Sequence, residues 1–354
     1  AYALLKENQQ KYPDFLPTYK TLGFIMAGAG AIPTQYEWIL TILGIEKDVE
    51  KGMEYLFRIS RQKENIWSIE TYLLLCYLQA YLLNQSEKAY HTLEQIIVEQ
   101  PSLSSVRLAC AWIGIRAGKS KESYRLLQNF PKMEFYFIPY LEGICLLQTG
   151  NYQEAIKAFE AFLHRNPTTD YIKDSYYKMF LASWFLGKEN QAVFFLNAVR
   201  NKGSTHNTQD QYAFQFAHYA RLPNKKITEA RILTDGGELE KALKILEELN
   251  PDELLSTEDK VEYLYRKARI RHKMHDYSEA IRLYKDCITA SHSIARYFAP
   301  SACLMLGFMY KDIFSDNEKA LFYFQKTLTY SNHEYKKSLD NQAKMAILML
   351  KKHN

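Results

Sequence analysis

The sequence has few of the residues that interrupt regular structure: 14 glycines and 10 prolines in 354 residues. Long linkers and low-complexity tracts are therefore not expected. The five cysteines form no CxxC pair, and each lies in an apolar helical pattern, where a free thiol behaves as a small hydrophobe. No disulfide framework is indicated. No apolar run reaches the ~18 residues that could span a membrane.

An excess of one charge is also missing. The formal net charge is +5, with lysine and arginine interspersed among aspartate and glutamate. Nucleic-acid binding usually needs a clustered basic face, so we expect no nucleic-acid partner. Free cysteines favour a reducing compartment, but the bacterial periplasm or envelope stays open beside the cytoplasm.

Motifs of catalysis are absent as well. The sequence has no HExxH zinc motif, no GxxxxGK[ST] phosphate loop and no GxSxG nucleophile elbow. His272 and His275 lie three residues apart, but no nearby cysteine or carboxylate completes a metal-ligand set. We therefore expect no enzymatic activity, no cofactor and no metal.

What the sequence does have is a repeated pattern, clearest between residues 143 and 167. Gly143 allows a partner helix to approach closely, and Gly150 ends the first helix. Ala155 faces the small residue from the second helix, Phe159 lies one turn further on the same side, and Pro167 ends that helix. This order of small, turn, alanine, phenylalanine and proline positions resembles the tetratricopeptide repeat.

The alanine position recurs along the chain, at spacings of 34, 32, 37, 50, 38 and 40 residues. Its occupants are Ala89, Ser123, Ala155, Ala192, Ala242, Ala280 and Ala320. The ideal repeat has a period of about 34 residues. The resemblance implies an all-α fold, a right-handed superhelix (α-solenoid) of tandem antiparallel helix pairs.

Two irregular stretches divide the predicted array. Residues 1–200 form an N-terminal sub-array that is irregular near 28–33, where Gly28, Gly30 and Pro33 interrupt a helix. Its first repeat looks truncated, because the first segment resembles a second helix whose partner precedes the sequence. Residues 201–223 form a polar loop and an extra helix from about Gln209 to Arg221. Residues 224–354 form a C-terminal sub-array closed by a capping helix over 334–352.

Both ends of the chain also resemble one subgroup, the tetratricopeptide-repeat-protein-39 type and its bacterial relatives, many of them in Bacteroidota. The residues that carry this resemblance are Pro33, Tyr36, Trp38, Leu43-Gly44, Gly52, Tyr297–Pro300, Leu306-Gly307 and Gln342–Lys344. It implies a helical repeat protein, sometimes associated with a membrane or envelope, with no established activity.

The family resemblance also implies a binding surface, because the first helices of such repeats line a concave face. The residues expected there are Leu74, Tyr81, Trp112, Tyr140, Tyr177, Trp184, Arg231, Tyr265, Arg269, His272, Phe308 and Lys311. Aromatic residues and arginine are the types that dominate binding energy at interfaces. We therefore expect a non-catalytic scaffold that binds a protein or peptide. The alternative is a regulatory receptor for a signalling peptide, with an effector domain outside this sequence.

Overall fold

The computed structural model describes residues 1–30, 32, 37–62, 66–128, 130, 135–219, 221–254, 256–291 and 296–352. In these residues the chain forms twenty α-helices and one short 3-10 helix, and no strand. The predicted all-α class is confirmed. None of the helices in the described ranges combines the length and the low polarity of a membrane span.

The helices of the first half begin and end as follows: α1 Tyr2–Lys11, α2 Leu16–Ala29, α3 Glu37–Ile42, α4 Val49–Ser60, α5 Ser68–Tyr81, α6 Ser86–Glu99, α7 Ser104–Ala117, α8 Ser120–Gln128, α9 Ile138–Gln148 and α10 Tyr152–Arg165. Those of the second half are α11 Ile172–Phe185, α12 Glu189–Asn201, α13 Thr208–Ala217, α14 Lys225–Asp235, α15 Leu239–Glu247, η2 Pro251–Glu253, α16 Thr257–Lys273, α17 Tyr277–Ala290, α18 Phe298–Asp312, α19 Asn317–Thr329 and α20 Lys336–Lys352.

The chain divides into two compact units. Unit 1 comprises Ala1–Ile113 together with His292–Asn354, and unit 2 comprises Gly114–Ser291. The division therefore joins the two ends of the chain in one unit. The two sub-arrays predicted on either side of residues 201–223 describe the repeat pattern, and they stay a prediction.

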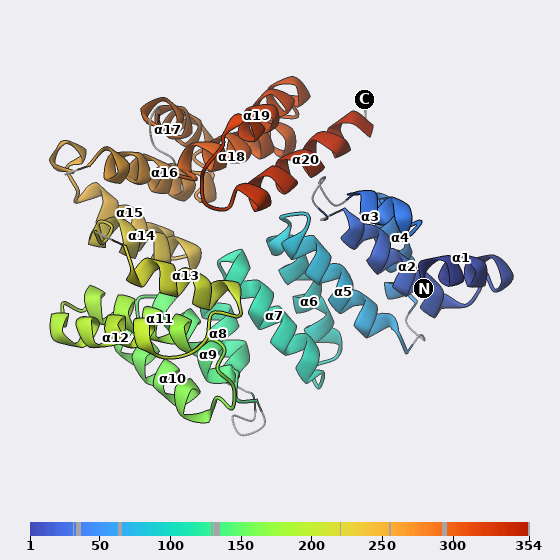
Figure 1. The fold of residues 1–354 in the computed structure, drawn as a ribbon, viewed down its shortest axis with the longest axis horizontal. Helices are drawn as coiled ribbons and strands as arrows, with labels where there is room; N and C mark the ends of the chain where they lie inside the picture. The colour runs from blue at the N-terminus through green and yellow to red at the C-terminus, as the bar shows by residue number, and fades with distance from the viewer. Residues whose placement is uncertain are drawn as a thin grey trace. The chain divides into compact units, whose positions relative to one another are not determined.

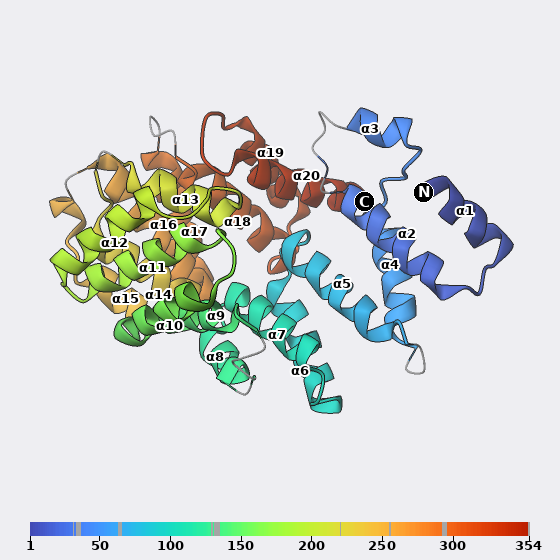
Figure 2. The same cartoon turned by 60° about the horizontal axis from the view of Figure 1, so that its bottom comes forward.

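In unit 2 the helices pair in the order of the sequence: α9 with α10, α11 with α12, α14 with α15 and α16 with α17 (Figures 1 and 2). The second helix of one pair also packs on the first helix of the next, as α10 does on α11. This is the stacking of an α-solenoid, in which each repeat buries its apolar face against its neighbours.

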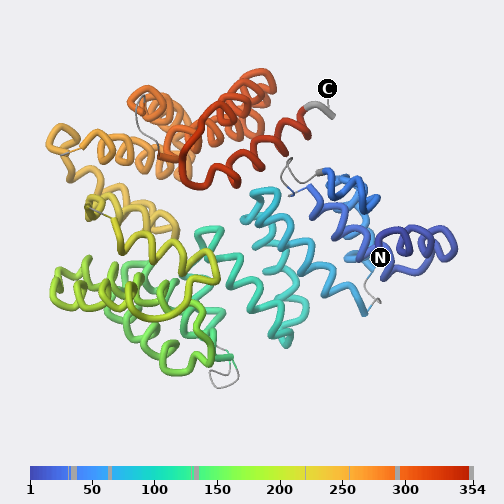
Figure 3. Tube along the Cα trace, in the orientation of Figure 1, coloured from blue at the N-terminus to red at the C-terminus, as the bar shows by residue number. Residues whose placement is uncertain are grey.

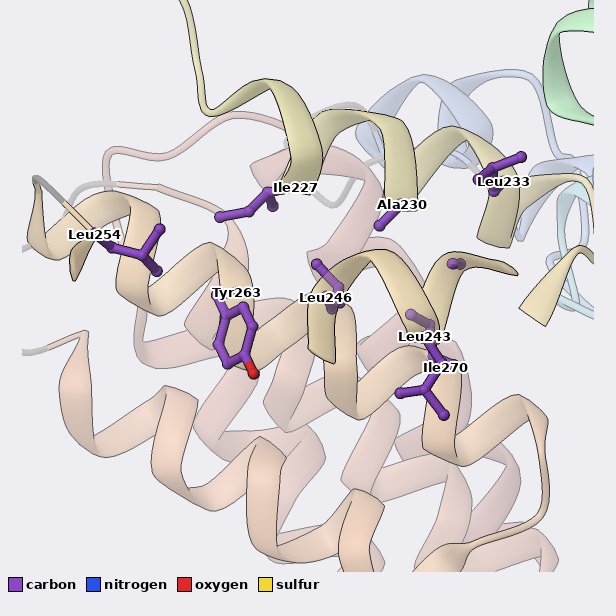
Figure 4. Packing of buried hydrophobic residues seen from close by; sticks show 9 residues of the cluster. Ile227, Ala230, Leu233, Leu243, Leu246, Leu254, Tyr263 and Ile270 are labelled. Atoms are coloured by element: carbon purple, nitrogen blue, oxygen red, sulfur yellow. The ribbon is translucent and has the colours of Figure 1, made fainter. Parts of the chain in front are cut away.

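The core around α14, α15 and α16 shows how such a repeat is filled (Figure 4). Leu233 of α14, Leu243 and Leu246 of α15, and Tyr263 and Ile270 of α16 are all buried in one cluster. Ile227, Ala230 and Leu233 recur every three residues on α14, and Tyr263 and Ile270 lie seven residues, or about two turns, apart on α16. Each of these helices therefore presents a single apolar stripe to the cluster.

Unit 1 follows the same principle with two additions. The pairs are α2 with α4, α5 with α6, and α18 with α19. The six-residue α3 lies in sequence between the members of the first pair. Helix α20, drawn in red near the C-terminus in Figure 3, packs on α19 and α18. Its role as the cap of the array stays a prediction. Its Met345 also joins the apolar cluster of Ala27, Val49 and Met53.

The irregular stretches take definite forms where the structure describes them. Helix α2 continues to Ala29, beyond the expected break at Gly28, while Ala31, Pro33 and Tyr36 lie outside the described residues. The extra helix predicted from Gln209 is α13, and it packs on α11. Its Asp210 is fully buried and accepts hydrogen bonds from the backbone N–H groups of Tyr171 (2.6 Å) and Asp174 (2.8 Å). A displaced helix thus caps the start of a repeat helix.

Candidate functional site

Tyr81 of α5 is the most exposed of the predicted binding residues, at 39%, and Trp112 of α7 lies against it. Leu74, Tyr77 and Tyr81 of α5, together with Trp112 of α7, form what we call the aromatic face. The rings of Tyr77 and Tyr81 stack with centroids 4.8 Å apart, and the indole Nε1 of Trp112 donates a hydrogen bond of 2.6 Å to the Tyr81 hydroxyl. The structure therefore brings Tyr81 and Trp112 together.

The spacing along α5 explains why these side chains share one side. Tyr77 follows Leu74 by three residues and precedes Tyr81 by four, which places all three on one helical stripe. The residues between them, Leu75 and Cys76, are fully buried. Tyr77 is 53% exposed and Tyr81 is 39% exposed, so the stripe opens to solvent.

Tyr77 is the residue that the repeat frame missed. It lies outside the helix positions that the family resemblance assigns to the concave face. A signal for it was present in the sequence, since a tyrosine one turn before Tyr81 extends the same stripe.

Two further predicted residues of unit 1, Phe308 and Lys311, lie on α18. The ring of Phe308 is half-buried and packs edge-on against Phe324, with centroids 5.1 Å apart. Lys311 forms an ion pair of 2.6 Å with Asp312, and its Nζ lies 5.9 Å from the Phe308 ring centroid. Part of the Phe308 surface is therefore buried in the core between α18 and α19.

In unit 2, Tyr177 and Arg231 are joined directly. The Arg231 guanidinium of α14 donates hydrogen bonds to the hydroxyls of Tyr177 (3.2 Å) and Tyr212 (3.3 Å). Burial raises the pKa of Tyr177 well above its ordinary value, so the phenol stays neutral and accepts this bond. The arrangement links α11, α13 and α14. The Tyr177 hydroxyl therefore already has a hydrogen-bond partner inside the fold.

Tyr140 and Tyr265 are also buried by helices of unit 2. The Tyr140 hydroxyl donates a hydrogen bond of 2.6 Å to Asp174, which also pairs with Lys178. Tyr265 packs near Tyr284, with ring centroids 6.2 Å apart. The Tyr140 hydroxyl therefore has its hydrogen-bond partner inside unit 2, and the Tyr265 ring has its packing partner there.

Arg269 and His272 lie within one turn of each other on α16. Arg269 forms an ion pair of 3.1 Å with Asp235. Burial opposes the charge on Arg269, but Asp235 and Tyr265 outweigh it and raise its pKa. Burial, with the charges of Lys273 and Arg269, lowers the pKa of His272 to about 4. His272 is therefore neutral near pH 7.

Trp184 of α11 is half-buried and stacks on Phe180, with centroids 5.5 Å apart. It is not among the residues that the Arg231 hydrogen bonds connect. The seven predicted residues of unit 2 thus divide into small groups inside the repeats, whereas Leu74, Tyr81 and Trp112 share a partly exposed surface in unit 1.

For metal chemistry, the described residues hold no group of three or more histidine, cysteine, aspartate or glutamate side chains arranged to bind an ion. His275, the second histidine of the spaced pair, instead places Nδ1 2.6 Å from the Tyr277 hydroxyl. The five cysteines are free and buried.

Two stretches of the chain match models of the tetratricopeptide repeat family, residues 140–169 and residues 261–291. The first contains most of α9 and all of α10, and the second contains most of α16 and all of α17, so each match coincides with one observed helix pair. The chain therefore contains tetratricopeptide repeats at these two places. Such repeats are in general non-catalytic modules for protein interaction. The likeness to the tetratricopeptide-repeat-protein-39 type stays a prediction.

Among solved structures, the chain is similar to a tetratricopeptide repeat protein from Parabacteroides merdae, at 13% identity and a TM-score of 0.33, over 78% of this chain and 98% of that one. It is also similar to yeast Tom70, at 13% identity and a TM-score of 0.32, over 99% and 85% of the two chains. A third is the repeat domain of P58(IPK), at 14% identity and a TM-score of 0.29, over 90% and 96%. No curated protein matches the sequence.

Proposed function

We propose that this protein is a non-catalytic scaffold that binds a polypeptide segment, and that the aromatic face of unit 1 is its main contact surface. The observation that carries the proposal is the exposure of the stacked Tyr77 and Tyr81 beside Trp112. Tyrosine and tryptophan supply large contact areas with few rotatable bonds, and they dominate the binding energy of interfaces.

The hydrogen bond between Trp112 and Tyr81 supports the same role. It links side chains of two successive first helices at 2.6 Å and so holds both rings before a partner arrives. A surface that is already ordered loses less side-chain entropy on binding. The remaining predicted contacts, on α18 and in unit 2, are proposed as secondary.

The test uses peptides selected for binding to the full chain from a random display library. Each selected peptide is then titrated against Trp112→Ala, Tyr81→Ala and Tyr77→Ala. We expect Trp112→Ala to weaken binding by roughly tenfold or more, since the loss of a hot-spot residue costs about 2 kcal/mol.

Phe322→Ala is the matched control, because Phe322 is a similarly exposed aromatic residue on α19 of the same unit. It should leave the affinities unchanged. If every selected peptide binds the three aromatic-face variants as tightly as the unaltered chain, the proposed surface is wrong.

The alternative of a signalling-peptide receptor stays a prediction, and the same titrations bear on it. A short peptide that binds as tightly as the longer segment from which it derives would favour a receptor over a scaffold.

A further inference from the structure

Three turns of unit 2 that are far apart in the sequence meet in the structure. They are residues 118–120 at the junction of α7 and α8, residues 148–150 at the junction of α9 and α10, and residues 236–238 at the junction of α14 and α15. We call this group of three turns the turn clasp. It joins helix pairs that are not neighbours in the chain.

The backbones in the turn clasp approach so closely that glycine is required. A β-carbon added to Gly237 would come within 2.2 Å of the Gly118 carbonyl oxygen. One added to Gly236 would come within 2.3 Å of the Gln148 carbonyl oxygen. Gly237 also has a positive φ of 88°, which glycine adopts readily. Its missing side chain therefore serves both the turn and the contact with the α7–α8 junction.

Hydrogen bonds hold the same three turns together. The backbone N–H of Ser120 donates a long bond of 3.4 Å to the Gly236 carbonyl, and the Ser120 hydroxyl donates to Gln148 Oε1 at 2.6 Å. The Lys241 ammonium of α15 donates to the Thr149 carbonyl at 3.3 Å. Each of the three turns is thus bonded to at least one of the others.

Glu238 is the ionic centre of the turn clasp. It is 8% exposed and forms ion pairs with Lys121 of α8 (2.6 Å) and Lys241 of α15 (2.9 Å). The side chains of both lysines are more than half exposed, so dissolved salt weakens these pairs. The turn clasp therefore combines a close backbone contact with a charge contact that responds to ionic strength.

A regular solenoid has no contact of this kind, because each repeat touches its neighbours alone. In this chain α11, α12 and α13 separate α10 from α14. Helix α14 nevertheless packs on α9, and the Tyr152 hydroxyl of α10 donates a hydrogen bond of 2.7 Å to Glu229 of α14. Unit 2 is therefore closed on itself at the turn clasp.

The contacts across the turn clasp differ from those within the helix pairs. The apolar cluster of α14, α15 and α16 consists of residues between 227 and 274, and it includes none from α7 to α10. Across the clasp the contacts described above are backbone, hydrogen-bonded and ionic. Contacts of this kind open more readily than a buried apolar core.

We propose that the turn clasp is a conformational latch. When it opens, α14–α17 move away from α7–α10 as a body, about the hydrogen bonds of Arg231 to Tyr177 and Tyr212, and each helix pair keeps its own core. The latch gives unit 2 two shapes, between which salt or a bound partner can select. It lies wholly in unit 2, so it does not rest on the function proposed for the aromatic face of unit 1.

Gly237→Ala tests the backbone contact. Gly187→Ala is the matched control, because Gly187 occupies the α11–α12 junction with a similar φ of 74° and has no described atom within 4 Å of an added carbon. Both variants strain a positive φ, so their difference isolates the turn clasp. We expect the Ser120 amide to exchange roughly tenfold faster in Gly237→Ala, since a carbonyl oxygen cannot move aside as a side chain does. Equal Ser120 exchange in the two variants would overturn the proposal.

Glu238→Gln tests the charge contact, with Glu240→Gln at an exposed position of the same helix as its control. We expect Glu238→Gln to speed Ser120 exchange roughly fivefold, and about 1 M NaCl to do the same in the unaltered chain. Glu240→Gln should change nothing. Because Glu238→Gln removes both ion pairs, salt should have little further effect on it. A salt effect of equal size in that variant would contradict the role of Glu238.

The body movement is measured by the distance between two spin labels, at Glu122→Cys on α8 and Lys244→Cys on α15. Both positions are exposed, and the native cysteines are buried. We expect one distance at low salt and an additional, longer one either in Gly237→Ala or at about 1 M NaCl without that substitution. The salt series keeps the test valid if Gly237→Ala fails to fold. A single unchanged distance under both conditions would overturn the latch, even where Ser120 exchange is faster.

Discussion

The ring of Phe159 lies directly against the backbone of Gly143: a β-carbon added to Gly143 would come within 2.7 Å of the ring carbon Cε1. The pair joins α9 to α10. The same relationship recurs between Gly307 of α18 and Phe324 of α19, where the added carbon would lie 2.5 Å from Cδ1. In both units, the space that a glycine leaves on one helix is thus filled by an aromatic ring from the paired helix.

Gly143→Ala should lower the free energy of unfolding by about 1–3 kcal/mol, because the fully buried Phe159 ring has no room to move away from the new methyl group. Chemical denaturation followed by circular dichroism measures the change. Gly28→Ala is the control: it lies in α2, and no atom lies within 4 Å of its added carbon. The control should be neutral or stabilising by about 0.5 kcal/mol. Equal effects of the two substitutions would contradict the packing argument.

Asp210→Ala should destabilise unit 2 by about 1–3 kcal/mol, because it leaves the buried N–H groups of Tyr171 and Asp174 without their acceptor. Hydrogen exchange should show faster exchange at the start of α11. Asp210→Asn keeps one acceptor oxygen and should lose less. Asp14→Ala, at an exposed aspartate of unit 1, should change neither measurement. Unaltered exchange at α11 in Asp210→Ala would show that the cap is unimportant.

Stability should fall as the pH drops from about 6.5 to about 4 through the titration of His272. The folded pKa is lowered from 6.5 to about 4, so over this range the unfolded chain binds a proton that the folded chain does not. The free energy of unfolding therefore keeps the full contribution of His272 above pH 6.5, and it has lost roughly 3 kcal/mol of it by about pH 4.

Denaturation midpoints measured at several pH values test this titration in His272→Gln. The variant should show a shallower decline between pH 6.5 and 4 than the unaltered chain, whereas His164→Gln, at an exposed histidine, should not. Parallel declines in the unaltered chain and His272→Gln would refute the assignment.

The five free thiols should react only slowly with a water-soluble disulfide reagent while the protein is folded. Burial raises the pKa of Cys76 and of Cys110 to about 12 and that of Cys303 to about 11, and it raises that of Cys145 as well. The reactive thiolate is therefore rare and inaccessible. The absorbance of the released thiol should be small at first and should reach five equivalents in denaturant. Rapid reaction of any thiol in the folded state would contradict this.

The repeat pattern predicted most of the fold because its rules are local. Gly143, Gly150, Ala155 and Phe159 occupy positions whose meaning depends only on neighbours within one helix pair. The same local rules predict where each second helix lies against the first helix of its pair. The cap that Asp210 provides to α11 was not predictable in this way, since its partners lie 39 and 36 residues away in the sequence.

The binding residues illustrate the same difference. Leu74 remains partly exposed, whereas Tyr140 and Tyr177 occupy the equivalent place in the repeat frame and are buried. The frame gives the side of the helix on which a residue lies, but it does not show what else packs there. At Tyr177, Tyr212 of the inserted α13 and the Arg231 side chain take up that space, whereas the Tyr140 hydroxyl bonds to Asp174.

The sequence by itself determined the helical class, the tetratricopeptide repeat and the close contact of small residues with rings, because each is set by residues within one repeat. Only the tertiary structure decided which aromatic side chains reach solvent, and only it brought Met349 of α20 to a pocket beside Val49 and Met53 of α4. Burial and hydrogen-bond satisfaction depend on segments far apart in the chain, and no local pattern encodes them.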